Sequence, residues 1–167
     1  MDFFNQTGKL AIGSRLRMLT DKITVDAAAI YKMFGVDLKP KWFPVFFVLS
    51  RGEAKTITSI AKEIGHSHPS VSNIIKEMVA KGLVKETKDK SDGRRNMVML
   101  SAKGKRMSDS FSEQCIDVTA AIEQITQQTR NDLWEAIEEW ENLLLDKSLL
   151  ERVKEAKKER ESKDIKI

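Results

Sequence analysis

Residues 58–105 read TSIAKEIGHSHPSVSNIIKEMVAKGLVKETKDKSDGRRNMVMLSAKGK, and this stretch decides the fold. In its first half the apolar residues recur every three or four positions, which predicts helices at about 59–64 and 68–81. The turn between them, Gly65-His66-Ser67, is short and contains a glycine. Two helices joined by such a turn are typical of a helix-turn-helix.

Capping residues support both predicted helices. Thr58 is the expected N-cap of the first helix, and Gly65 ends it. Ser67 is the expected N-cap of the second helix, where Pro69 is tolerated because the first N–H groups lack helical acceptors. Gly82 suits the position just after that helix.

The apolar spacing changes after Gly82. Residues 83–87 and 96–100 read as two short strands, and the polar turn at 88–95 between them contains Asp-Gly. The fold class is therefore expected to be mainly α with a two-stranded β-wing, a winged helix-turn-helix.

The second helix separates into two faces. Its inner face is apolar, whereas its start and outer face carry Ser67, His68, Ser70, Ser72, Asn73 and Lys76. Small polar side chains let a helix lie deep in the major groove, where Asn73 could pair with adenine and Lys76 could reach a phosphate or a guanine. The alternative is that these residues are ordinary caps and surface residues.

The predicted hairpin tip carries Lys90, Asp92, Arg94 and Arg95. An extended arginine can enter a narrow minor groove, where negative potential is concentrated. Asp92 has the wrong sign for a DNA contact, but a carboxylate can hold a neighbouring guanidinium in one pose. We expect Asp92 to orient one arginine while the other enters the groove. The alternative is that Asp-Gly makes the turn and the arginines are solvated.

Charge is unevenly distributed along the chain. Residues 51–106 have a net charge of +7, residues 107–146 have −9, and the two ends have +3 each. A basic middle beside an acidic segment favours a polyanionic partner for the middle alone. The chain has one cysteine, no apolar run long enough for a membrane span and no signal-peptide pattern, so the expected location is cytoplasmic.

Further helices are expected on both sides. Apolar residues at helical spacing predict one helix at 9–34 and a short buried helix between Pro40 and Gly52. After Ser101, an expected N-cap, helices are predicted to about 128, at 130–145 and at 148–161.

The quoted stretch resembles the MarR family of bacterial winged-helix regulators. The likeness rests on the Gly-Leu-Val exit at 82–84, on Asp92-Gly93-Arg94-Arg95 and on Leu100-Ser101-x-x-Gly104, and it covers about residues 10–145. It implies a homodimer whose two winged lobes contact a pseudo-palindrome, with the helix at 68–81 in the major groove and Arg94 or Arg95 in the minor groove. It also implies a small-molecule effector pocket between the dimer helices and the lobe.

The resemblance suggests four parts. These are an N-terminal dimerisation helix at 1–35, a winged helix-turn-helix DNA-binding lobe at 36–101, C-terminal dimerisation helices at 102–146 and a charged helical tail at 147–167.

A narrower likeness is to the regulator half of family members fused to an acetyltransferase. It rests on residues 11–22, 30–50 and 65–72. A fused acetyltransferase would need well over 100 further residues and a glycine-rich acyl-CoA loop, so we expect no enzyme activity.

Other residues invite a chemical role. Trp42 and Phe46, with Phe43 and Phe47, could line an effector pocket or simply form core. Cys115 could sense oxidants, although a small buried hydrophobe is the plainer interpretation. His66 and His68 have poor spacing for zinc and no adjacent Cys or acidic partner, so we expect no metal and no cofactor. Glutamates at 135, 138, 139 and 141 are interpreted as a solvated helix face.

The expected function is a sequence-specific, double-stranded DNA-binding transcriptional regulator, a repressor acting as a homodimer. The alternative is a winged-helix module that docks another protein and does not bind DNA. Retention of Lys76, Arg94 and Arg95 favours DNA.

Overall fold

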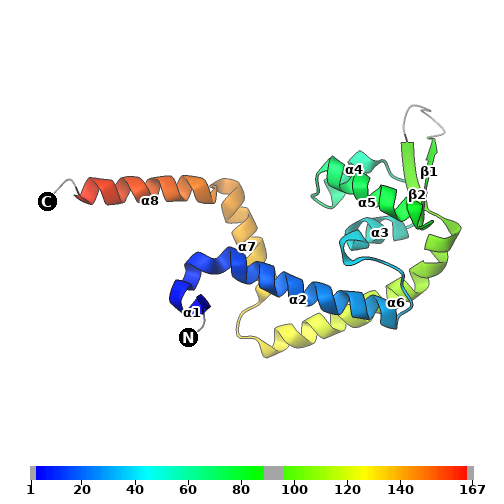
Figure 1. Cartoon of the computed structure of the whole chain (residues 1–167), viewed down its shortest axis with the longest axis horizontal. Helices are drawn as coiled ribbons and strands as arrows, with labels where there is room; N and C mark the ends of the chain where they lie inside the picture. The colour runs from blue at the N-terminus through cyan, green and yellow to red at the C-terminus, as the bar shows by residue number, and fades with distance from the viewer. Residues whose placement is uncertain (1–2, 89–95, 165–167) are drawn as a thin grey trace. The chain divides into compact units, whose positions relative to one another are not determined.

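The computed structural model describes residues 3–88 and 96–164 (Figure 1). In chain order the elements are α1 (Phe3–Thr7), η1 (Gly8–Ala11), α2 (Ile12–Met33), η2 (Pro40–Trp42), α3 (Phe43–Ser50), α4 (Ile57–Glu63), α5 (His68–Ala80), β1 (Val84–Lys88), β2 (Asn96–Leu100), α6 (Ala102–Gln128), α7 (Leu133–Asp146) and α8 (Leu149–Asp164). The predicted class, mainly α with a two-stranded β-wing, is confirmed. The chain divides into two compact units, Met1–Asp117 and Val118–Ile167.

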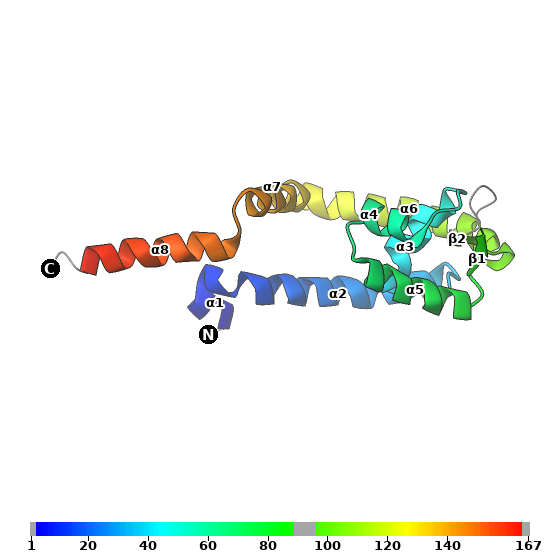
Figure 2. The ribbon, with the colours of Figure 1, turned by 90° about the horizontal axis from the view of Figure 1, so that it is seen from above.

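The first unit holds the hydrophobic core. Its largest fully buried side chains are Trp42, Phe46, Phe111, Leu49, Ile60, Ile75, Met78 and Leu83. They come from helices α3 to α6 and from the segments beside them, and Phe46 meets Phe111 edge to face with ring centroids 4.8 Å apart. Figures 1 and 2 both place α3, α4 and α5 next to the β1–β2 hairpin. The core therefore fixes the helix-turn-helix against the wing.

The predicted N-cap of the first helix was wrong by two residues. Thr56 has extended backbone, and its hydroxyl oxygen accepts a hydrogen bond from Ser59 N at 3.1 Å, as an N-cap requires. Thr58 lies inside the first turn of α4. Thr56 is the cap because its extended backbone lets its hydroxyl reach Ser59 N, whereas Thr58 already has helical backbone.

The second helix begins at His68 as predicted and ends at Ala80, one residue before the predicted end. The Ser67 hydroxyl oxygen accepts from Ser70 N at 3.4 Å, and Pro69 lies in the first turn of α5. Gly82 follows the helix at φ +70°, a conformation that L side chains rarely adopt. Gly35 ends α2 in the same way at φ +66°.

The hairpin is antiparallel, with Val84 opposite Leu100 and Lys88 opposite Asn96. Lys88 belongs to β1, so the predicted tip begins one residue too early. Lys55 forms an isolated antiparallel β-bridge with Val98, which sequence reasoning missed. The Lys55 N–H donates to Val98 O at 2.9 Å, and the Val98 N–H donates to Lys55 O at 2.7 Å. This pairing ties the wing to the segment before α4.

The flanking helices agree with prediction except at their ends. The first long helix, α2, begins at Ile12 after the 3-10 turn η1, rather than at residue 9. Helix α7 begins at Leu133 rather than 130, because the Asp132 carboxylate caps it by accepting from Trp134 N at 2.8 Å and Glu135 N at 3.2 Å. Within the described ranges, no helix has the length and apolar content needed to cross a membrane.

Candidate nucleic-acid interface

Helix α5 presents one buried and one exposed face. Val71, Ile74, Ile75 and Met78 are buried in the core. The side chains of Ser70, Asn73 and Lys76 are exposed and that of Ser72 is half-buried. The side chains of Asn73 and Lys76 make no hydrogen bond or ion pair with any other described residue. The buried face of α5 therefore fixes the helix against the core, and its outer face is available to bind an external partner.

The N-terminal end of α5 is also exposed. Ser67 and His68 lie there, both accessible to solvent. The N–H groups of a first helical turn carry partial positive charge and favour an anion such as a phosphate. The structure thus brings six of the predicted DNA-contacting residues onto one helix: Ser67, His68, Ser70, Ser72, Asn73 and Lys76.

The remaining predicted contacts, Lys90, Asp92, Arg94 and Arg95, lie outside the described residues. The last described pair of the wing is Lys88 and Asn96, whose side chains are joined by a hydrogen bond from Lys88 Nζ to Asn96 Oδ1 at 2.8 Å. The roles of the four tip residues stay predictions.

Sequence reasoning missed Glu77, on the last turn of α5. Its carboxylate accepts hydrogen bonds from Lys41 Nζ at 2.6 Å, from the Trp42 indole Nε1 at 3.0 Å and from Lys39 Nζ at 3.3 Å. These donors, Lys41 first, lower the pKa of Glu77 from 4.5 to about 2. The sequence signal that could have identified Glu77 is that it is an acidic residue on a helix whose other polar residues are basic or neutral.

The exit from α5 is joined to the start of α6. Ser101 N donates to Leu83 O at 2.9 Å, the Ser101 hydroxyl donates to Gly82 O at 2.5 Å, and Gly104 N donates to Ser101 Oγ at 3.1 Å. Ser101 is thus an N-cap, as predicted, and it also satisfies carbonyl groups of the exit turn. A Cβ at Gly104 would lie 2.2 Å from Leu83 O, so only glycine allows this close approach.

Two of the four aromatic residues considered for an effector pocket, Trp42 and Phe46, are core residues. Trp42 and Phe46 are 1% and 0% exposed and pack within the buried cluster. Phe43 and Phe47 are partly exposed at its edge. The burial of Trp42 and Phe46 favours the structural interpretation, and the effector pocket stays a prediction.

Cys115 is half-buried against the same core. Burial raises the pKa of its thiol, which disfavours the reactive thiolate. Nearby, burial raises the pKa of Tyr31 to about 12, with Cys115 adding to the rise and a hydrogen bond with Gln114 opposing it. This environment supports the interpretation of Cys115 as a small hydrophobe, and a redox role stays untested.

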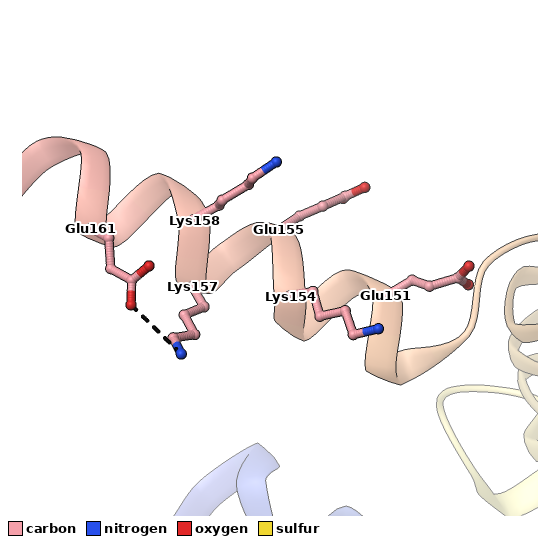
Figure 3. A pocket seen from close by; sticks show the side chains of 6 residues that line it. All are labelled: Glu151, Lys154, Glu155, Lys157, Lys158 and Glu161. Atoms are coloured by element: carbon pink, nitrogen blue, oxygen red, sulfur yellow. Dashed lines mark ion pairs between the residues drawn. The ribbon is translucent and has the colours of Figure 1, made fainter.

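No group of three or more His, Cys, Asp or Glu side chains within the described ranges could hold a metal ion. Helix α8 borders a hollow of about 440 Å³, shown in Figure 3. All of its lining side chains come from this one helix, and they are charged and exposed: Glu151, Lys154, Glu155, Lys157, Lys158 and Glu161. An enclosed ligand site needs walls from several elements, so this hollow is the surface of a solvated helix.

Comparison with known proteins finds a matching family model and similar solved structures. Residues 36–95 match a family model described as MarR family. No curated protein sequence matches the chain. A solved structure of the transcriptional repressor CouR bound to a 23-mer DNA duplex has 20% identity and a TM-score of 0.61, covering 83% of this chain and 96% of that one.

Two other solved structures share the fold. The adhesin competence repressor AdcR from Streptococcus pyogenes has 19% identity and a TM-score of 0.58, covering 80% of this chain and 95% of that one. The PcaV transcriptional regulator from Streptomyces coelicolor, in complex with its natural ligand, has 14% identity and a TM-score of 0.58, covering 81% and 92%. Residues 36–95 are therefore similar to the MarR family, and the chain has the winged helix-turn-helix fold of these solved structures.

Proposed function

We propose that the protein is a sequence-specific, double-stranded DNA-binding transcriptional regulator, a repressor acting as a homodimer on a pseudo-palindromic site. The observation that carries this proposal is the outer face of α5, where Ser70, Asn73 and Lys76 are exposed on a helix whose other face is buried. A rigid helix with short polar side chains suits the major groove, and the net charge of +7 over residues 51–106 suits a phosphate backbone.

The known regulators support the same proposal. CouR is described as a repressor and is bound to DNA in its structure, and AdcR is also described as a repressor. PcaV is bound to its natural ligand, which favours a small-molecule effector for the present chain as well. A regulator of this kind acts where the DNA lies, so the proposed location is the cytoplasm, and no enzyme activity is proposed.

Exposed apolar side chains support a homodimer. Helix α2 leaves Ile12, Leu16, Leu19 and Ile23 exposed at helical spacing. Helix α7 does the same, with Trp134 72% and Trp140 55% exposed. Patches of this kind mark interaction surfaces on a single chain, and a second copy is the proposed partner.

The test begins with DNA. Duplexes enriched by the protein from a random-sequence pool are compared with scrambled duplexes of equal composition by fluorescence anisotropy at several salt concentrations. We expect affinity to fall steeply with salt, because phosphate contacts release counterions. Failure to shift any duplex at low salt would refute the proposal and favour the protein-docking alternative.

Asn73 supplies the sequence-reading arm of the test. Asn73→Ala should cost about 1–3 kcal/mol on the enriched duplex and little on the scrambled one, because a base contact is lost. Lys76→Ala is the matched comparison, since a phosphate contact should weaken both duplexes alike. Equal losses for Asn73→Ala on both duplexes would make Asn73 a backbone contact.

A further inference from the structure

Glu77 is in an unfavourable place for an isolated helix. It lies in the last turn of α5, where the helix dipole is negative and a carboxylate is repelled. Lysine or arginine would suit this turn better. The residue is therefore better explained by its contacts outside α5.

Those contacts reach one short segment, residues 39–42. Lys39, Lys41 and Trp42 all donate to the Glu77 carboxylate, and Lys39 Nζ also lies 5.0 Å from the centre of the Trp42 ring. Trp42 is 1% exposed, so its indole N–H would be a costly unpaired donor without Glu77. We call Glu77 with these three donors the Glu77 clamp.

The segment 39–42 is where the chain enters the lobe from α2. Val36 and Leu38, between α2 and η2, are buried in the core, so this connection is itself fixed. On its other side, the end of α5 is fixed to α6, because Lys103 Nζ donates to Lys81 O at 3.1 Å. Lys103 Nζ also lies 3.8 Å from Asp37 Oδ2, which joins the α6 start to the same connection. Thus the C-terminal end of α5 is held to the segments leading to both long helices.

We propose that Glu77 is a positioning residue: through the Glu77 clamp it sets the angle at which α5 presents Ser70, Ser72 and Asn73 to base edges. This inference rests on the proposed DNA-binding function. Seven residues separate Glu77 from Ser70, which is about 10 Å along a helix. A tilt of about 6° at Glu77 therefore moves Ser70 by about 1 Å, enough to break a hydrogen bond to a base.

The test compares Glu77→Ala, Glu77→Gln and the control Glu63→Gln. Glu63 is also ion-paired, to Lys55 Nζ at 2.8 Å and to Arg51, but it lies on α4 rather than α5. Glu77→Gln and Glu63→Gln remove the same charge, so their effect on general phosphate attraction is matched. Glutamine at 77 still offers an oxygen to the Trp42 indole, whereas alanine offers none.

The readout is the ratio of affinities for the enriched and the scrambled duplex, measured where circular dichroism shows native helix content. We expect Glu77→Ala to lower this ratio about tenfold, Glu77→Gln to lower it about threefold and Glu63→Gln to leave it unchanged, because lost geometry affects base contacts more than phosphate contacts. A ratio that stays unchanged in both Glu77 variants, or falls equally in Glu63→Gln, would overturn the proposal. If Glu77→Ala does not fold, Glu77→Gln decides.

Amide hydrogen exchange of the DNA-free protein separates this proposal from the proposed function. Exchange in the last turn of α5 should rise at least tenfold in Glu77→Ala while exchange in α4 is unchanged. Unchanged exchange in α5 would contradict the clamp. If no duplex is enriched at all, the proposed function fails, and the anchoring of α5 by Glu77 is judged on exchange alone.

Discussion

At the scale of single residues, Gly104 shows how one missing side chain can fix a junction. The backbone of α6 passes so close to the exit from α5 that a Cβ would lie 2.2 Å from Leu83 O. A backbone carbonyl cannot turn aside as a flexible side chain can. The contact also brings Ser101 within reach of the Gly82 and Leu83 carbonyl groups.

Gly104→Ala should therefore lower the free energy of unfolding by about 1–3 kcal/mol, the usual cost of overpacking. Urea unfolding followed by circular dichroism measures it. Gly13→Ala is the matched control, because Gly13 lies in α2 with nothing within 4 Å of the added Cβ. That control should be neutral or slightly stabilising, since alanine favours helix. Equal effects at both positions would contradict the close approach at Gly104.

Glu77 gives the protein a pH-dependent contribution to stability. Its pKa is lowered from 4.5 to about 2 by Lys41, Trp42 and Lys39, so the folded state prefers the carboxylate. The stability gained is therefore fully present above 4.5 and is lost as the pH falls toward 2. The urea midpoint of wild type should exceed that of Glu77→Gln at neutral pH, and the difference should shrink below 4.5. A difference that stays constant down to pH about 3 would show that the charge of Glu77 is not involved.

At the scale of elements, the patterns along the chain predicted the helix-turn-helix well because local rules dominate there. Helix α5 begins after Ser67, whose side chain caps it, and ends before Gly82, which has a positive φ. Serine and glycine at these positions can both be recognised in the sequence. Thr56 and Thr58 are both plausible caps by composition. The backbone decides between them, because Thr56 is extended while Thr58 lies within the helix that begins at Ile57.

Non-local contacts were harder to foresee. The pairing of Lys55 with Val98 joins residues 43 positions apart, and nothing in the local pattern at Lys55 indicates a strand. The Glu77 clamp was missed for the same reason, since its donors lie 35 to 38 positions earlier. The outer face of α5 could be predicted because its apolar stripe identifies the opposite face as exposed.

The wing is the second element proposed to bind DNA. Arg94→Ala combined with Arg95→Ala should reduce affinity for the enriched duplex at least about tenfold, because a minor-groove contact and phosphate attraction are both lost. Anisotropy titration measures this, and Lys85→Ala with Lys88→Ala in β1 removes the same charge as a control. A loss no larger than in that control would refute a specific role for the two arginines.

At the scale of the whole molecule, the charge distribution suits one segment to contact with a phosphate backbone, and the exposed apolar faces suit another to contact with protein. Residues 51–106 carry the net charge of +7, whereas residues 107–146 carry −9 and would repel a phosphate backbone. The acidic segment includes α7, whose apolar side chains are exposed. This segment suits contact with protein rather than with DNA.

Light scattering should report twice the monomer mass for the wild-type protein. Leu16→Glu should shift the protein toward monomer, because Leu16 is apolar and 43% exposed on the proposed dimer face of α2. Ser14→Glu is the control: it adds the same charge to α2 about 160° around the helix from Leu16. A monomeric wild type, or equal dissociation of both variants, would contradict the dimer proposal.

The division of α5 into a buried and an exposed face also bears on how a regulator of the proposed kind could diverge. The side chains of Asn73 and Lys76 make no hydrogen bond or ion pair with the described residues, so replacing them leaves the core residues untouched. After a gene duplication, a few codon changes on this face could redirect one copy to a new set of promoters while both copies keep folding. A library randomised at Ser70, Ser72, Asn73 and Lys76 would then be rich in folded proteins with altered preferences.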